Sequence, residues 1–333
     1  MKLYRGLLLA VVCVAMLLAR FPSHGLAAPR RERPAKQAQT AGDDPLERLA
    51  PDLTVVRDIV FKQIGETKLD LILFPPAAPQ TTSPNPKSPL VVYIHGGGWG
   101  GGDKYKVLRP DILGVVRALV QQGVACASVE YRLADGKPTT ALEALADCKD
   151  AVRYLRLNAS KYGIDRERVG TFGSSAGGHL TLVTALGDDR DYPCDRALDG
   201  GAGQVRCVAA YYPLVSFVDR AVMQGSNFER PQRLVPLLGG TLEEKRDLAL
   251  QLSPIELLRS DSPAIFVAHG DHDRVLSYVN ATTLRDAAQA KGIPIECVIS
   301  KGADHGFGGD GIDPDIAEIN RRTVAFFLKY LGD

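Results

Sequence analysis

The stretch VGTFGSSAGGH, at residues 169–179, joins a β-forming run to a helical run that ends at Leu186. It contains the pattern G-x-S-x-G, centred on Ser175. A serine in this pattern occupies a strained turn between strand and helix, where glycines let the backbone pack closely and the hydroxyl group points above the sheet. The bare pattern also occurs in ordinary Gly/Ser turns, so a nucleophilic Ser175 needs support from other parts of the chain.

Strands and helices alternate around this stretch. Apolar runs predict strands, and an apolar period of three to four residues predicts helices. The expected strands cover residues 55–60, 69–74, 90–94, 124–129, 168–172, 205–212, 264–268 and 295–299, and the expected helices cover about 107–122, 141–159, 179–186 and 316–331. Thr140 and Glu143 predict a capping box at the second helix. The alternation predicts an α/β fold, with a mostly parallel central sheet, helices on both faces and a site at the carboxyl ends of the strands.

Three further strand ends carry residues that suit the same chemistry. HGGGW follows the third expected strand at 95–99, and its glycines allow backbone N–H groups to face a substrate oxygen. HGDHDRV at 269–275 offers an acid, and GADHGF at 302–307 offers His305 as a base. The chain order Ser, Asp, His is the one used by the α/β-hydrolase fold. From the residues alone, either Asp271 or Asp273 could be the acid.

On these motifs the sequence resembles the α/β-hydrolase superfamily, in the esterase and lipase branch that carries HGGGW and GxSAGG. It is most similar to the carbohydrate acetyl and feruloyl esterase-like members, also called acetyl xylan esterase-like. The resemblance also includes EYRL at 130–133 and KYGID at 161–165, and it runs from about Val55 to Leu331. Many members read YRLAPE where this chain has YRLADG at 131–136, a difference in a loop near the substrate pocket.

The resemblance implies roles for individual residues. Ser175, Asp273 and His305 would form the catalytic triad, and the backbone N–H groups of Gly97, Gly98 and Ala176 would form the oxyanion hole. Trp99 follows the glycine loop, where it either packs in the core or lines the substrate pocket. The expected activity is hydrolysis of short-chain acyl esters of small molecules or carbohydrates through an acyl-enzyme.

Other function classes fit less well. A serine peptidase or amidase of the same fold is the main alternative, because a triad and an oxyanion hole serve amides equally well. A binding protein without activity is disfavoured, since no triad residue is missing. No cofactor or metal is expected: His269 and His272 lie beside two aspartates but lack a second ligand cluster. The glycines of 96–101 match G-x-G-x-x-G, but no acid follows at the distance a dinucleotide site requires.

Composition gives an ordinary globular protein. The chain has 333 residues, 45% of them hydrophobic, and its 40 Lys and Arg balance 39 Asp and Glu to a formal charge of +1. Such a balance disfavours nucleic acid as a partner. The insertion at 212–264 carries many charged residues, which predicts a solvated excursion and a small, open acyl pocket.

The first residues are typical of a signal peptide. Lys2 and Arg5 precede an apolar run, Leu7–Ala19, of about 13 residues, which is shorter than the ~20 that cross a bilayer. Small residues follow at 25–28. We therefore expect a cleaved signal peptide at 1–27, a flexible linker at 28–50 and a catalytic domain at 51–333, and an exported, periplasmic or secreted protein without a membrane span in its mature form.

Five cysteines follow the expected signal peptide, so at least one would be a free thiol in an exported protein. Cys194 and Cys207 bracket a polar, Gly-rich loop. Cys126 and Cys148 lie in apolar patterns, where a cysteine behaves as a small hydrophobic residue. The pattern therefore predicts a disulfide between Cys194 and Cys207.

Overall fold

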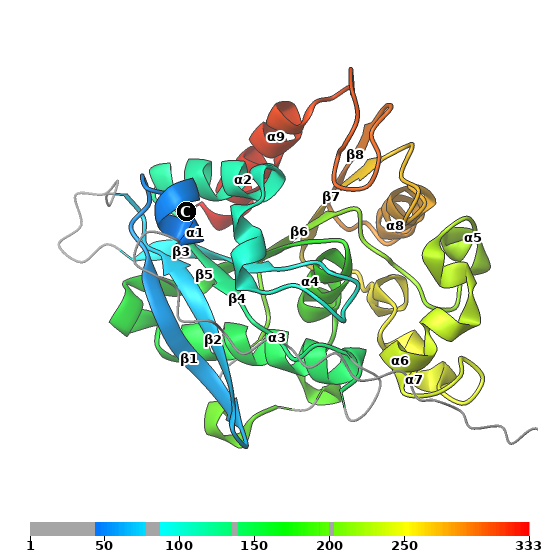
Figure 1. Cartoon of the computed structure of the whole chain (residues 1–333), viewed down its shortest axis with the longest axis horizontal. Coiled ribbons are helices and arrows are strands. Elements are labelled where there is room, and N and C mark those ends of the chain that lie inside the picture. The colour runs from blue at the N-terminus through cyan, green and yellow to red at the C-terminus, as the bar shows by residue number, and fades with distance from the viewer. Residues whose placement is uncertain (1–43, 78–86, 135–138, 193, 200–202, 333) are drawn as a thin grey trace, which may run out of the picture. The chain divides into compact units, whose positions relative to one another are not determined.

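A computed structural model describes residues 44–77, 87–134, 139–192, 194–199 and 203–332. The expected signal peptide and most of the expected linker lie outside these residues. The described chain is built on one eight-stranded sheet (Figure 1). Its strands are β1 Val56–Ile64, β2 Thr67–Phe74, β3 Ser88–Ile94, β4 Ala125–Val129, β5 Ile164–Ser174, β6 Cys207–Tyr211, β7 Ala264–Gly270 and β8 Ile295–Ser300.

The sheet has the order β1-β2-β4-β3-β5-β6-β7-β8 and is mostly parallel, as predicted. β2 runs antiparallel to both of its neighbours, β1 and β4, and all later pairs are parallel. β1 and β2 form a hairpin, with Ile64 opposite Thr67 across the turn. The carboxyl ends of β3, β5, β7 and β8 therefore lie at one edge, where the sequence motifs are found.

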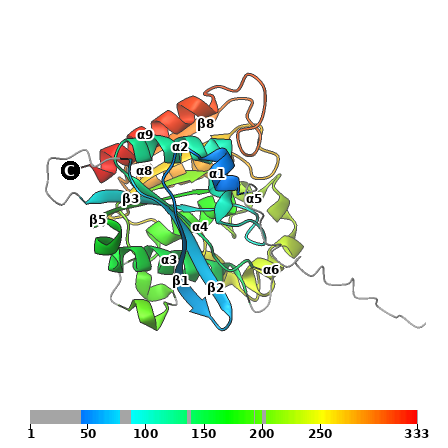
Figure 2. The ribbon, with the colours of Figure 1, turned by 60° about the vertical axis from the view of Figure 1, so that its left-hand side comes forward.

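Helices cover both faces of this sheet (Figure 2). α2 (Pro110–Gln121) and α9 (Ile316–Leu331) lie side by side on one face and bury one apolar cluster. α3 (Ala141–Leu157), α4 (Ala176–Leu186) and α8 (Val279–Ala290) bury the second cluster on the other face. The α/β prediction is confirmed. α8 was not predicted, because few large apolar residues mark its inner face.

The remaining helices are short. α1 is Pro45–Leu49, and α5 (Arg220–Met223), α6 (Val235–Leu238) and α7 (Arg246–Gln251) lie in the insertion between β6 and β7. The capping box of α3 is confirmed: Leu142 N–H donates to Thr140 Oγ1 at 3.2 Å, and Thr140 N–H donates to the Glu143 carboxylate at 2.7 Å. None of the helices in the described ranges is long and apolar enough to cross a membrane.

The expected linker ends earlier than residue 50. Asp44 caps α1 by accepting a hydrogen bond from Leu46 N–H at 2.9 Å. Leu46 and Ala50 are 1% and 2% exposed, and they pack into the cluster beneath α2. Because these two side chains are buried, residues 44–50 belong to the folded domain.

The predicted disulfide is wrong, because Cys194 and Cys207 are both free thiols. Cys207 begins β6 and points to the face covered by α9, where its Sγ and the ring of Phe327 approach the same point above Gly170. Cys194 lies on the opposite side of the sheet, over α3, and its Sγ donates to the Asp195 carbonyl oxygen at 3.2 Å. Bracketing a loop in the sequence does not place two cysteines on one face of a sheet.

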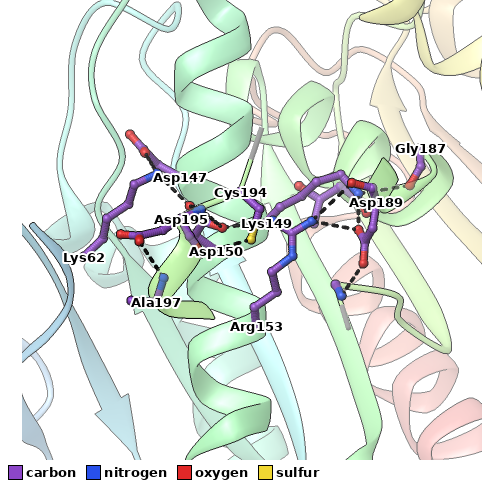
Figure 3. Close-up of polar contacts among 12 residues, drawn as sticks. Lys62, Asp147, Lys149, Asp150, Arg153, Gly187, Asp189, Cys194, Asp195 and Ala197 are labelled. Atoms are coloured by element: carbon purple, nitrogen blue, oxygen red, sulfur yellow. Dashed lines mark hydrogen bonds and ion pairs between the residues drawn. The ribbon is translucent and has the colours of Figure 1, made fainter. Parts of the chain in front are cut away.

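Ion pairs hold this loop instead, as Figure 3 shows. Asp150 of α3 is buried and accepts from Lys62 Nζ at 2.6 Å and from Asp195 N–H at 3.2 Å. The preceding residue of α3, Lys149, donates to Asp189 Oδ1 at 2.9 Å. α3 is thereby tied both to the edge strand β1 and to the loop that follows α4.

Candidate active site

Ser175 lies at the sharp turn between β5 and α4. Its φ is 56°, in the left-handed region that a residue with a side chain rarely adopts. A Cβ atom on Gly173 would lie 2.2 Å from the Gly177 carbonyl oxygen, and one on Gly177 would lie 2.1 Å from the Ile94 carbonyl oxygen. Only glycine fits at these two positions, which explains the pattern around the serine. The turn holds the hydroxyl group above the carboxyl end of β5.

The two other predicted triad residues come from neighbouring strand ends. His305 follows β8 and its Nε2 lies 3.0 Å from Ser175 Oγ. Its Nδ1 lies 2.7 Å from Oδ2 of Asp273, which follows β7. Asp271, the other candidate acid, accepts instead from Gly302 N–H at 2.7 Å. The structure thus brings Ser175, His305 and Asp273 into one hydrogen-bonded chain.

The Asp273 carboxylate is held on both oxygens. Oδ1 accepts from Val275 N–H at 2.8 Å and from Leu276 N–H at 2.9 Å, and Oδ2 lies 3.1 Å from His269 Nε2 as well as near His305. Burial by itself would raise the pKa of this carboxyl group, but the hydrogen bonds from His269 and His305 outweigh it and lower the pKa below its ordinary value. The group therefore stays ionised and can stabilise an imidazolium at His305.

His269 is a site residue that the sequence analysis missed, since it was considered only as a metal ligand. Its ring is fully buried, and Nε2 also donates to the Leu276 carbonyl oxygen at 2.9 Å. Its position four residues before Asp273 was the feature of the sequence that could have indicated this role. Within the described ranges, no group of three or more His, Cys, Asp or Glu side chains is placed to hold a metal ion.

The glycine loop after β3 lies directly against the serine turn. A Cβ atom on Gly96 would be 3.1 Å from Ser175 Cβ, and Gly97 and Gly98 have φ of 141° and 61°. Ala176 is the first residue of α4, so its N–H has no acceptor within the helix. These backbone groups and the positive end of the helix dipole suit a developing oxyanion beside Ser175.

Two aromatic residues brace the glycine loop. His95 is buried and stacks on Tyr131 with ring centroids 4.2 Å apart, and Tyr131 donates its hydroxyl hydrogen to the His95 carbonyl oxygen at 2.8 Å. Burial lowers the pKa of His95 to about 4, so the ring is neutral at pH 7. This contact places His95 in a supporting position and gives Tyr131 of the EYRL motif a structural role.

Trp99 both packs in the core and lines the pocket, the two roles that its position in the sequence allowed. It is 1% exposed, and its indole N–H donates to His179 Nδ1 at 3.1 Å. It also lines a pocket of about 410 Å³ at the triad. His179 in turn donates from Nε2 to the Leu252 carbonyl oxygen at 2.7 Å, which fixes the ring that holds the indole.

The insertion between β6 and β7 builds part of this pocket. Asn227, Phe228, Arg233, Pro236 and Leu237 line it together with the glycine loop and the triad. The Phe228 ring lies 5.3 Å from the Trp99 ring, edge to face. The expectation of a solvated excursion is therefore wrong for this part of the insertion, because apolar residues interleaved with its charged ones are buried or face the pocket.

The strand, sharp turn and helix around Ser175, with base and acid on neighbouring strand ends, define the class of protein: the chain is an α/β-hydrolase. The BD-FAE family model matches residues 77–287, and the chain belongs to this family. The matched range begins before β3 and ends within α8, so it includes the glycine loop, Ser175 and Asp273.

Curated relatives carry esterase names. The chain is 27% identical to Esterase LipC of Mycobacterium tuberculosis over 74% of this chain and 59% of that protein. It is 25% identical to Esterase LipI of the same organism over 88% of both chains. The chain spans 48% to 59% of the length of LipC, LipQ and LipM, the first of these relatives.

Solved structures share the fold. A thermophilic esterase from the Planctomycetes species Thermogutta terrifontis superposes with a TM-score of 0.67 at 23% identity, over 85% of this chain and 93% of that one. At this identity the match establishes the α/β-hydrolase fold alone.

Proposed function

We propose that the chain is an exported carboxylic ester hydrolase that cleaves short-chain acyl esters through an acyl-enzyme. The observation that carries the proposal is the hydrogen-bonded chain from Ser175 through His305 to Asp273, which opens into a pocket beside the glycine loop. Membership of the BD-FAE family and the esterase names of the relatives support it.

The roles follow from the geometry. His305 Nε2 accepts the Ser175 proton while Ser175 Oγ attacks the ester carbonyl carbon, and the carbonyl oxygen becomes an oxyanion. N–H groups of Gly97, Gly98 and Ala176 stabilise that charge. When the intermediate collapses, the bond to the alkoxy oxygen breaks and the His305 proton passes to the leaving alcohol. Water, deprotonated by the same imidazole, then attacks the acyl-enzyme and releases the acid.

We propose short acyl groups and carbohydrate alcohols as the natural substrate class. The pocket of about 410 Å³ must hold both parts of the ester near the triad, which favours small acyl groups. The Thermogutta esterase, which shares the fold, was solved with propionate and with butyrate bound. The carbohydrate part rests on the resemblance to acetyl and feruloyl esterase-like proteins.

The proposed export rests on the first residues, where Lys2 and Arg5 precede the apolar run 7–19 and the small residues 25–28. Mass spectrometry of the protein purified from a bacterial periplasm or medium tests it. A mature N-terminus near residue 28 is the expected result. Retention of the intact N-terminus in the cell would exclude cleavage and export.

The enzymatic proposal is tested with p-nitrophenyl acetate and a matched series of aminoacyl p-nitroanilides. We expect hydrolysis of the ester with kcat/KM well above that of any anilide. Ser175→Ala should lose at least about 10³-fold in kcat, because it removes the attacking oxygen. A Ser175→Ala variant that retains tens of per cent of the activity would overturn the proposal, and faster cleavage of the anilides would establish the peptidase or amidase alternative.

A further inference from the structure

Basic side chains line the pocket at the triad. Lys106, Arg109 and Arg233 all line it. The described residues that line it include no Asp or Glu. Since the whole chain is close to neutral, this is a local concentration of charge that the general composition does not explain.

Arg109 is already neutralised. Its Nε and Nη2 donate to the two carboxylate oxygens of Asp111 at 2.9 and 3.1 Å. Tyr212 also donates its hydroxyl hydrogen to Asp111, at 2.8 Å, and its ring lies 4.6 Å from the His305 ring. Arg109 and Asp111 therefore act as a bidentate ion pair that supports the wall behind His305.

Lys106 and Arg233 are different. In the described part of the chain, neither cation forms an ion pair with a carboxylate within 4.0 Å; Lys106 is half-buried and Arg233 is exposed. Lys106 lies on the 3₁₀ helix Lys104–Leu108, just after the glycine loop, and Arg233 lies on the 3₁₀ helix Pro231–Arg233 of the insertion. Two segments far apart in the sequence thus each bring one unpaired cation to the same small pocket.

We propose that this pocket selects esters that carry an anionic group, such as a carboxylate, near the scissile bond. The inference rests on the proposed ester hydrolase function and narrows its substrate class. Lys106 and Arg233 bind the anion by charge-assisted hydrogen bonds, while Trp99, Phe228 and Leu237 contact the apolar part of the substrate. For a carbohydrate ester, the corresponding substrates are esters of acidic sugars or acyl groups that end in a carboxylate.

Two pairs of esters test this and locate the charge. In the first pair, p-acetoxybenzoate carries the carboxylate in the alcohol part, and methyl p-acetoxybenzoate is its neutral match. In the second pair, mono(p-nitrophenyl) glutarate carries it in the acyl part, and p-nitrophenyl pentanoate is its match. Each enzymatic kcat/KM, corrected for spontaneous hydrolysis, is divided by the rate constant of the same ester with hydroxide. This removes differences in intrinsic reactivity.

We expect at least one pair to favour the charged member by about tenfold, the effect of one hydrogen bond to a charged group. The preference should fall between about 0.05 M and about 0.5 M NaCl, because salt screens partly exposed charges. The pair that shows it identifies the side of the ester bond on which the anion binds.

Variants attribute the preference to the two cations. For the pair of esters that shows the preference, Lys106→Gln or Arg233→Gln should lower the ratio of normalised kcat/KM, charged ester over neutral ester, by about tenfold. Arg230→Gln removes an exposed cation of the same insertion that does not line the pocket, so this control should keep the ratio. Equal or better hydrolysis of the neutral ester in both pairs, or a ratio that survives in both variants, would overturn the inference while leaving the esterase proposal intact. If all four esters are inert, the esterase proposal itself fails.

Discussion

At Asp273, four donors converge on one carboxylate: two backbone N–H groups and the rings of His269 and His305. The backbone donors hold one carboxylate oxygen and the two rings share the other, so four hydrogen bonds together fix the position of the group. Such a fixed carboxylate orients the His305 ring with its proton on Nδ1 and leaves Nε2 free to accept from Ser175.

Asp273→Asn should lower kcat for p-nitrophenyl acetate by about 10³- to 10⁴-fold, because an amide allows the wrong tautomer of His305. Asp271→Asn is the matched control two residues away, and its Oδ1 can still accept from Gly302 N–H. We expect it to stay close to the wild type. A larger loss for Asp271→Asn than for Asp273→Asn would reverse the assignment of the acid.

His269 is expected to act on the reaction through Asp273. His269→Leu removes one donor from the carboxylate, which leaves more of its negative charge to stabilise a protonated His305. We therefore expect the acid limb of the kcat/KM profile to move to higher pH and kcat to fall by about tenfold, with KM little changed.

His269→Gln provides the control, because its amide N–H₂ can restore a donor at about the same place. It should recover most of the activity and return the acid limb toward the wild-type position. A uniform loss in both variants without a shift of the pH profile would indicate a purely structural role for His269.

At the scale of elements, the ion pairs of α3 connect the edge of the sheet to the loop after α4. Asp189 receives Lys149 Nζ at 2.9 Å and Gly203 N–H at 2.5 Å. Burial lowers the pKa of Lys149, which shows how costly its charge would be without a partner. This contact holds the loop that a disulfide had been expected to close.

Asp189→Asn should destabilise the fold by about 2 to 4 kcal/mol, because it leaves the buried Lys149 ammonium without its counter-ion. Urea unfolding measures the change, and hydrogen exchange should show faster opening at residues 203–207. Asp188→Asn is the neighbouring control: Asp188 bonds to the exposed Arg190, so its loss should not change stability measurably. Equal effects of the two substitutions would show that the network does not hold the loop.

Secondary structure was largely predictable from local patterns. The apolar runs gave all eight strands to within a few residues, and the Thr140–Glu143 box marked the start of α3. α8 was missed because its buried positions include Asn280 and two alanines, Ala281 and Ala288, which do not produce a clear apolar period. The face on which a cysteine lies depends on strand pairing across the whole sheet, which no local pattern contains.

For the whole molecule, the candidate triad could be predicted because each motif immediately follows a strand, and a parallel sheet gathers its strand ends at one edge. The substrate pocket could not be predicted from the sequence. Part of its wall comes from Phe228 and Leu237, in an insertion whose sequence shows no regular apolar pattern, and the buried partner His269 differs from a surface histidine only through the fold. Substrate selection therefore depends on the part of the chain that sequence motifs describe least.

Acyl chain length is the property of the whole pocket that can be measured most directly. Each buried methylene contributes about 0.8 kcal/mol only where an apolar wall receives it. In the proposed reaction the pocket of about 410 Å³ would hold both parts of the ester, and Lys106 and Arg233, which have no carboxylate partner among the described residues, interrupt its apolar lining. We therefore expect kcat/KM for p-nitrophenyl esters to peak between acetyl and butyryl and to fall for longer chains.

The series should run from acetate to octanoate below the micellar concentration, with each rate referred to the hydroxide reaction of the same ester. Leu237→Ala is the diagnostic variant, because it removes part of the apolar wall contributed by α6 and enlarges the pocket. Its optimum should move toward longer acyl chains, whereas Leu157→Ala, at an exposed site on α3, should leave the optimum unchanged. If kcat/KM of the wild type still rises through octanoyl, the acyl chain binds beyond the lining residues of this pocket, and the restriction to short chains is wrong.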